Sequence, residues 1–283
     1  MEAKHFLKMQ LELGEGPRWD SRLGQLYFVD ILQGDFYLLD PHTMQLSRQN
    51  AGVSLGCLGL RAGPGLVMGT GHGFEVWEPG AASHAIPGLA FENPEIRFND
   101  GAVDRAGRFW AGAKAPRGHA HLYRLDPDWT IRVMDTGFAI CNGLGWSPDN
   151  RVMYFTDSFD HTIYAYDFDL ASGEIANRRI WVQVEPPATP DGLTVDSQGF
   201  VWSCLWDGGR VLRFDPQGKV AAEIHLPVPR PTACAFGGPD LDVLYITSAW
   251  EGYTPLERAR YPLSGDLFVA DPGVKGLPEP IFG

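Results

Sequence analysis

The sequence predicts an all-β fold, a six-bladed β-propeller with four-stranded antiparallel blades around a central channel. Three observations predict it. Glycine (34) and proline (22) make up 56 of the 283 residues and are spread along the whole chain, so helices would be interrupted too often for a helical bundle. Short alternating runs rich in aromatic residues lie between these turn residues. One residue pattern also recurs at a nearly constant interval, as propeller blades require.

Each repeat unit begins with a small or polar residue, usually acidic or amide and followed by glycine. An alternating run, a turn and an aromatic-rich strand come next. The four clear units begin at Glu15, Asp100, Asn142 and Asp191, and the two weaker units begin at Gly56 and Thr232. Consecutive units therefore begin 41 to 49 residues apart, which is the length of one four-stranded blade. A β-sandwich also has closely spaced strands, but it does not require one pattern to recur at this interval.

The stretch from His5 to Leu13 precedes the first unit, and it predicts the outer strand of the last blade, which would close the ring. No linker, low-complexity tract or long charge run interrupts the units. We therefore expect residues 1–283 to form a single domain.

Composition excludes several classes of partner. The net charge is −12 and no basic stripe occurs, which argues against nucleic-acid binding. No apolar run approaches the roughly 18 residues that span a membrane, and the first residues lack the apolar core of a signal peptide. The four cysteines (Cys57, Cys141, Cys204 and Cys234) have no metal-binding spacing and are predicted to be buried thiols in a reducing compartment. We expect a cytoplasmic monomer or weak homo-oligomer.

The first strands of propeller blades line the channel, and the repeat alignment puts Glu15, Asp100, Asn142 and Asp191 at equivalent positions there. Oxygen-bearing side chains facing one axis repel one another unless a cation lies between them. Such oxygens suit Ca²⁺, Mg²⁺ or Mn²⁺ better than a thiolate-selecting metal. A single Asp-Gly is more often a turn, but four in register favour a metal site.

These residues lie within longer blocks that resemble one family. The blocks are LGEGPRWD at 13–20, RFNDGAVDRAGRFWAG at 97–112, CNGLGWSPD at 141–149, YFTDSFDHTIYAYDFD at 154–169 and TPDGLTVDSQGFVW at 189–202. In this order they resemble the SMP-30/gluconolactonase/regucalcin-like family of six-bladed propellers over nearly the whole chain.

The resemblance implies a single divalent metal held by Glu15, Asn142 and Asp191, with Arg97 and Asn99 contacting the substrate beside it. Asp100 is not among the usual ligands of the family, and we interpret it as a neighbour of the ligands or a weaker ion site. The implied metal is Ca²⁺, Zn²⁺, Mn²⁺, Mg²⁺ or Fe²⁺.

The implied reaction is the hydrolysis of a sugar-acid lactone, an aldono-1,4- or 1,5-lactone, to its acid. The metal would polarise the carbonyl, and Asp191 is the expected general base. Because a bound cation makes a carboxylate a poorer base, metal-generated hydroxide with Asp191 as its orienting group stays open. A calcium-binding regulatory protein and a phosphoester or organophosphate hydrolase are the alternatives. The Arg97/Asn99 pair favours a sugar-binding enzyme.

The loop at 111–123, AGAKAPRGHAHLY, departs from the animal members of the family, which carry a longer lid with an acidic residue. Here the loop is short and basic, with Lys114, Arg117, His119 and His121. A cationic lid would suit a lactone that bears a carboxylate, whereas a solvated loop tip is the simpler interpretation. Trp206 and His161 are further candidates for the channel mouth.

Overall fold

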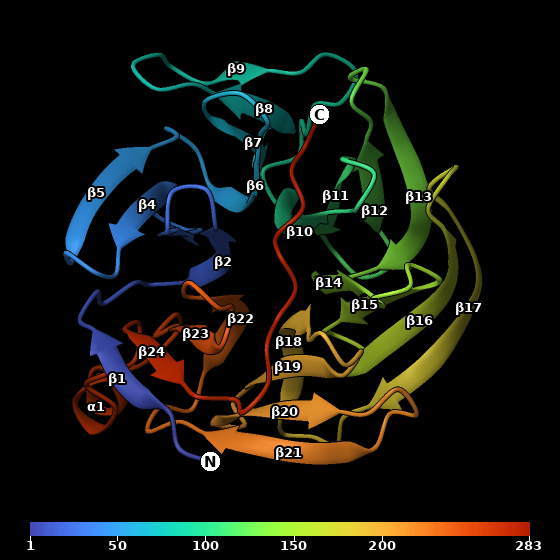
Figure 1. The fold of residues 1–283 in the computed structure, drawn as a ribbon. Coiled ribbons are helices and arrows are strands. Elements are labelled where there is room, and N and C mark those ends of the chain that lie inside the picture. The colour runs from blue at the N-terminus through green and yellow to red at the C-terminus, as the bar shows by residue number, and fades with distance from the viewer.

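The computed structural model describes residues 1–283 and consists of six four-stranded antiparallel sheets arranged in a ring (Figure 1). The first blade contains β2(Gly14–Asp20), β3(Gln25–Asp30), β4(Asp35–Asp40) and β5(Gln45–Asn50). The second contains β6(Leu55–Leu60), β7(Leu66–Thr70), β8(Phe74–Trp77) and β9(His84–Ala85). The third contains β10(Arg97–Val103), β11(Phe109–Lys114), β12(Ala120–Leu125) and β13(Ile131–Phe138). The next two are β14(Cys141–Trp146), β15(Val152–Asp157), β16(Thr162–Asp169) and β17(Glu174–Gln183); and β18(Thr189–Val195), β19(Val201–Trp206), β20(Arg210–Phe214) and β21(Val220–His225). The predicted six-bladed propeller is confirmed.

The sixth blade joins the two ends of the chain. It contains β22(Pro231–Gly237), β23(Val243–Ser248), β24(Leu267–Ala270) and, as its outer strand, β1(Lys4–Leu7). The carboxylate of Asp266 fixes the segment after β1, because its Oδ1 accepts the backbone N–H groups of Met9 (2.8 Å) and Gln10 (3.0 Å). The N-terminal segment thus closes the ring, as its position before the first repeat predicts.

Burial falls from the axis outwards. The innermost strands β2, β6, β14 and β22 are buried at every residue, whereas the outer strand β5 is exposed at every residue. The core lies between neighbouring blades. There the rings of Trp110 and Trp146 pack edge to face, with their centroids 6.1 Å apart. All four cysteines are buried and free, as predicted.

The innermost strand of every blade has an irregular register. An extra residue at such a β-bulge bends the strand and redirects its side chains. Close packing accompanies the bulges: a Cβ on Gly143 would lie 2.4 Å from the Leu193 nitrogen, and one on Gly192 would lie 2.5 Å from Ala233 Cβ. These glycines therefore allow the backbones of adjacent blades to approach, as their place after the channel residues predicts.

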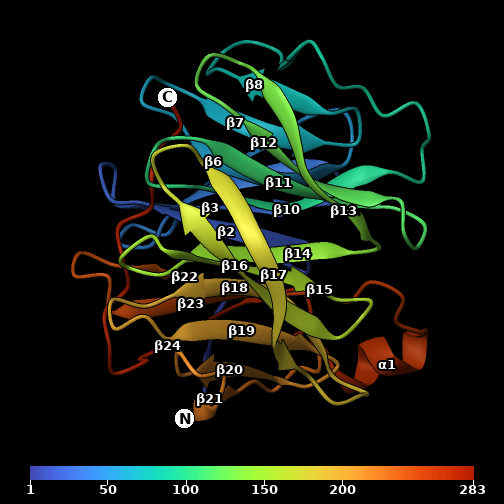
Figure 2. The same cartoon turned by 90° about the vertical axis from the view of Figure 1, so that its right-hand side faces the viewer.

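The two faces of the ring differ (Figures 1 and 2). The C-terminal tail crosses one face, where Glu279 Oε1 lies 3.4 Å from Arg18 Nε and the backbone of Phe282 bonds to Leu60. The short helix α1(Pro255–Arg260), which follows β23, lies on the opposite face (Figure 2). No helix is long and apolar enough to cross a membrane. The tail covers one end of the channel, so an accessible site belongs to the other.

A buried aspartate organises the hairpin turn in two of the blades. Asp196 accepts the backbone N–H groups of Gln198 and Phe200 through Oδ1, and the Trp202 indole N–H (3.0 Å) and the Arg213 guanidinium through Oδ2. Asp104 repeats this arrangement with Trp110 and Arg108. One carboxylate thus ties a turn, a core tryptophan and a cation together.

We predict that Asp196→Ala lowers the free energy of unfolding by about 3–5 kcal/mol, because it leaves the buried indole N–H of Trp202 without its acceptor and the partly buried guanidinium of Arg213 without its counter-ion. Urea unfolding followed by tryptophan fluorescence measures this change. Asp215→Ala is the matched control, since Asp215 caps a similar turn through Gln217 and Lys219 without a buried partner. Equal losses in the two variants would contradict this role for Asp196.

Candidate functional site

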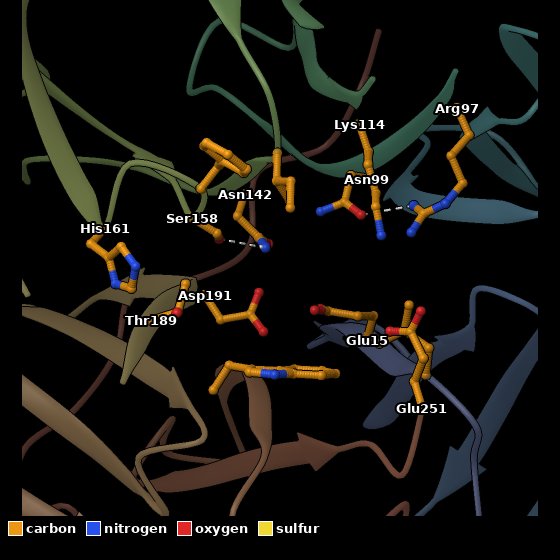
Figure 3. A pocket seen from close by; sticks show the side chains of 14 residues that line it. Glu15, Arg97, Asn99, Lys114, Asn142, Ser158, His161, Thr189, Asp191 and Glu251 are labelled. Atoms are coloured by element: carbon orange, nitrogen blue, oxygen red, sulfur yellow. Dashed lines mark hydrogen bonds between the residues drawn. The ribbon is translucent and has the colours of Figure 1, made fainter. Parts of the chain in front are cut away.

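A cavity of about 480 Å³ lies at the end of the channel that the C-terminal tail leaves uncovered (Figure 3). Its wall consists of two tiers of side chains. The deep tier contains Glu15, Asn99, Asn142 and Asp191. The upper tier has three sources. The first strands, or the residues just before them, supply Leu13, Arg97, Ile140 and Thr189, and the second strands, or the residues just after them, supply Lys114, Ser158 and Trp206. Connections between strands supply Phe159, His161 and Glu251.

The deep tier follows from blade geometry. Each of its side chains lies five residues before the residue at the hairpin turn, which is Asp20, Asp104, Ser147 or Asp196. The upper-tier residues of the first strands lie two residues earlier still, on the same side of the chain. In four of the six blades, the repeat therefore delivers one first-strand side chain to each tier.

Asp100 is not equivalent to Glu15, Asn142 and Asp191, contrary to the alignment of the repeats. Asn99 takes that position, and Asp100 follows it by one residue and does not line the cavity. The carboxylate of Asp100 lies 3.5 Å from the Arg18 guanidinium and accepts the Gly101 N–H (2.7 Å). The predicted position of Asp100 is therefore wrong. The register at the β-bulge, and not the Asp-Gly dipeptide, decides which side chain faces the cavity.

The two carboxyl groups of the deep tier are held in an unfavourable environment. Glu15 is 3% exposed and Asp191 is 5% exposed. Burial, followed by the charges of Asp191 and Asp100, raises the pKa of Glu15 well above its ordinary value. Burial and the charge of Asp100 do the same to the pKa of Asp191. Without a positive charge between them, these groups resist ionisation.

Two buried oxygens of the deep tier lack any hydrogen-bond donor, namely Asn142 Oδ1 and Asp191 Oδ1. The Asn142 amide is nevertheless held in place, because its Nδ2 donates to Ser158 Oγ (3.1 Å), and this hydroxyl donates to the Pro190 carbonyl (2.7 Å). A buried oxygen without a donor is costly unless a cation or water meets it.

The donor set therefore fits a hard divalent cation, with two carboxylates and one amide oxygen. No group of three or more His, Cys, Asp or Glu side chains gathers anywhere in the chain as a metal ligand set. The donor set proposed here contains only two such side chains, Glu15 and Asp191, and its third ligand is the amide oxygen of Asn142. Water would fill the remaining coordination positions of the cation.

Arg97 and Asn99 form one hydrogen-bonded unit at the wall (Figure 3). Arg97 Nη1 donates to Asn99 Oδ1 (2.7 Å) and to the Phe98 carbonyl (2.9 Å), and Asn99 Nδ2 donates to the Cys141 carbonyl (2.9 Å). Burial lowers the pKa of Arg97 to about 10. Asn99 thus fixes the guanidinium, whose Nε and Nη2 have no partner in the protein.

The five residues that the sequence nominates, Glu15, Arg97, Asn99, Asn142 and Asp191, all line this cavity, as do Trp206 and His161. Within the basic loop only Lys114 reaches it. The Arg117 side chain is 71% exposed and pairs with Asp160 at 3.1 Å, and His119 is exposed. Lys114, at the end of β11, is therefore the single basic residue of this loop that lies where it could contact a substrate.

Sequence reasoning missed Ser158, Thr189 and Glu251. Ser158 and Thr189 occupy the same upper-tier positions as Lys114 and Arg97 one and two blades earlier, so extending the repeat register to the strand ends would have found them. Glu251 lies in the connection after β23, outside any repeat, and carries no such signal.

Fold and site together define a six-bladed propeller with a buried acidic centre at one end of its channel. A model of the SMP-30/gluconolactonase/LRE-like region matches residues 13–250, and the chain belongs to this family. It is 39% identical to a 6-deoxy-6-sulfogluconolactonase of Pseudomonas putida, over 95% of this chain and 94% of that protein. It is 38% identical to regucalcin of Danio rerio, over 96% and 95% of the two chains. A solved regucalcin from Agrobacterium tumefaciens, described as calcium-binding, has the same fold, with a TM-score of 0.91 at 22% identity over 99% of this chain and 97% of that one.

We predict that Asp191→Asn raises the melting temperature of the metal-free protein by ~2–4 °C, because it removes one of the buried charges that repel one another. The same variant should lose most of the rise in melting temperature that added Mn²⁺ or Ca²⁺ gives the wild type. Differential scanning fluorimetry in EDTA and in metal measures both quantities.

Asp100→Asn is the matched control. Because Asp100 faces Arg18 and does not line the cavity, this variant should keep the full response to metal. A destabilised Asp191→Asn variant with a full response to metal would contradict the account of the deep tier.

Proposed function

We propose that the protein hydrolyses a sugar-acid lactone to the corresponding acid, with one divalent cation held by Glu15, Asn142 and Asp191. The observation that carries the proposal is the group of buried, unpartnered oxygens at the base of a cavity of about 480 Å³. Membership of a family that includes gluconolactonases supports it, and so does the name of the Pseudomonas relative.

The cation would be Ca²⁺, Mg²⁺ or Mn²⁺ by the hardness of its donors, and Zn²⁺ and Fe²⁺ also accept carboxylate and amide oxygens. When bound, such a cation polarises a carbonyl group and stabilises negative charge that develops on its oxygen. The pKa values of Glu15 and Asp191, which burial and like charges raise, indicate why the empty arrangement is unfavourable.

Asp191 is the residue we assign to water activation. Its carboxylate would accept a proton from the attacking water, whose oxygen bonds to the lactone carbonyl carbon. The bond from that carbon to the ring oxygen then breaks, the ring oxygen receives a proton, and the open-chain acid is released. Where the cation lowers the basicity of Asp191 too far, the same carboxylate orients the water instead.

Arg97 and Asn99 would position the lactone. The Nε and Nη2 groups of Arg97 are free to donate to hydroxyl oxygens of a sugar, and Asn99 keeps the guanidinium in place. Trp206, from the fifth blade, also lines the upper tier and offers an aromatic face of the kind on which sugar rings stack. These contacts distinguish a substrate pocket from a bare ion site.

A calcium-binding protein without catalysis is the second candidate, because the Agrobacterium structure is of a calcium-binding regucalcin. The two candidates differ in whether acid is released. A pH-indicator assay over a panel of aldonolactones, with and without EDTA, separates them. Metal-dependent acid release from at least one lactone is expected, and binding of metal without any acid release would favour the second candidate.

We predict that Asp191→Ala lowers kcat for lactone hydrolysis by ~10²–10⁴-fold, since the group assigned to the proton transfer is lost. The assay is run with metal in excess, so that weaker binding of the ion does not limit the rate. Asp240→Ala, at an exposed carboxylate paired with Lys275, serves as the control. Full activity of metal-loaded Asp191→Ala would remove Asp191 from the mechanism.

A further inference from the structure

Two cations of the upper tier, Arg97 and Lys114, face the cavity without an ion pair. Other buried arginines are neutralised: Arg108 lies 2.6 Å from Asp104, and Arg124 lies 2.7 Å from Asp126. Lys114 forms neither an ion pair nor a side-chain hydrogen bond, and Arg97 bonds only to the Phe98 carbonyl and to the Asn99 amide. Partly buried cations without a counter-ion are unusual in a folded protein.

The two cations are also direct neighbours. Arg97 on β10 is the cross-strand partner of Lys114 on β11 in the antiparallel ladder. Like charges directly opposite one another destabilise a sheet. Burial and the charge of Arg97 also lower the pKa of Lys114. A structural role for this pair is therefore hard to justify.

Nearby carboxylates do not remove the excess of positive charge. Glu15 and Asp191 lie in the deep tier, and a divalent cation there would neutralise both. Glu251 then remains as the single carboxylate facing two cations, and its charge acts on both although it forms an ion pair with neither. The upper tier beside blade three is thus a positively charged recess on top of a neutral centre.

The recess is confined to one side of the cavity. The equivalent positions in the next two blades are Ile140 with Ser158, and Thr189 with Trp206, which are apolar or hydroxyl-bearing. A ligand whose charge lies at one end, with an uncharged sugar part, matches this division.

We propose that Arg97 and Lys114 form a subsite for a carboxylate substituent of the lactone, so that the preferred substrates are lactones of sugar diacids. This inference rests on the proposed lactonase function and names its substrate class. The bound carboxylate accepts hydrogen bonds from Lys114 Nζ and from the free Nη2 or Nε of Arg97, and it replaces the counter-ion that the pair lacks. Lys114 is the specificity-determining residue, and Arg97 also serves the uncharged lactone.

The test compares a glucarolactone with a gluconolactone of the same ring size, on the wild type and on Lys114→Met and Lys114→Arg. We expect the wild type to have the higher kcat/KM on the glucarolactone. Lys114→Met should lower kcat/KM for the glucarolactone ~10-fold more than for the gluconolactone, mainly through KM, because one charge-assisted contact is lost. Lys114→Arg should restore most of the preference. Arg117→Met, in the exposed part of the same loop, should leave both values as in the wild type.

Equal or better wild-type rates on the gluconolactone, or a loss in Lys114→Met that is the same for both lactones, would overturn the proposal. A second arm does not depend on catalysis: calorimetry of glucarate and gluconate binding to the metal-loaded protein. If no lactone is hydrolysed, the proposed function fails, and this arm still decides the subsite. Glucarate binding that is tighter than gluconate binding and weakened by Lys114→Met supports it, and equal binding of the two acids contradicts it.

Discussion

The repulsion between buried carboxylates on the channel axis is the interaction on which the rest of the site depends. Glu15 and Asp191 come from the first and the fifth blade, and closure of the ring brings both, buried, to the base of one cavity. Burial raises the pKa of both carboxyl groups, the charge of Asp191 raises that of Glu15 further, and the charge of Asp100 adds to both. A fold that tolerates this arrangement needs either a protein cation or a bound one.

The two ends of the channel solve this problem differently. Towards the C-terminal tail, Arg18 lies between Asp100 and Glu279 and offsets their charge with a side chain. Towards the cavity no basic side chain lies between Glu15 and Asp191, and two oxygens there have no donor. The covered end is thus neutralised by a side chain of the protein, whereas the accessible end has no such cation, and this difference supports the proposed ion site.

The repeat predicts much of this from sequence. The six blades, the closing strand and the residues Glu15, Asn142 and Asp191 all follow from a pattern that recurs every 41 to 49 residues. The alignment fails at blade three, because an Asp-Gly dipeptide there is displaced by one residue from the β-bulge that aims the side chain. The place of Glu251 in the site could not be predicted from the repeat either. Glu251 lies in a connection whose path over the cavity is decided by tertiary packing. The loop at 111–123 has a basic composition, but only the end of a strand, at Lys114, has a fixed direction towards the cavity.

We propose that the deep tier binds one cation, and anomalous diffraction from crystals grown with Mn²⁺ can locate such an ion. We expect a single strong anomalous peak at the base of the cavity, coordinated by oxygens of Glu15, Asn142 and Asp191 at ~2.1–2.3 Å. A cavity without such a peak at saturating Mn²⁺, or a peak beside Asp100 and Glu279 instead, would contradict it.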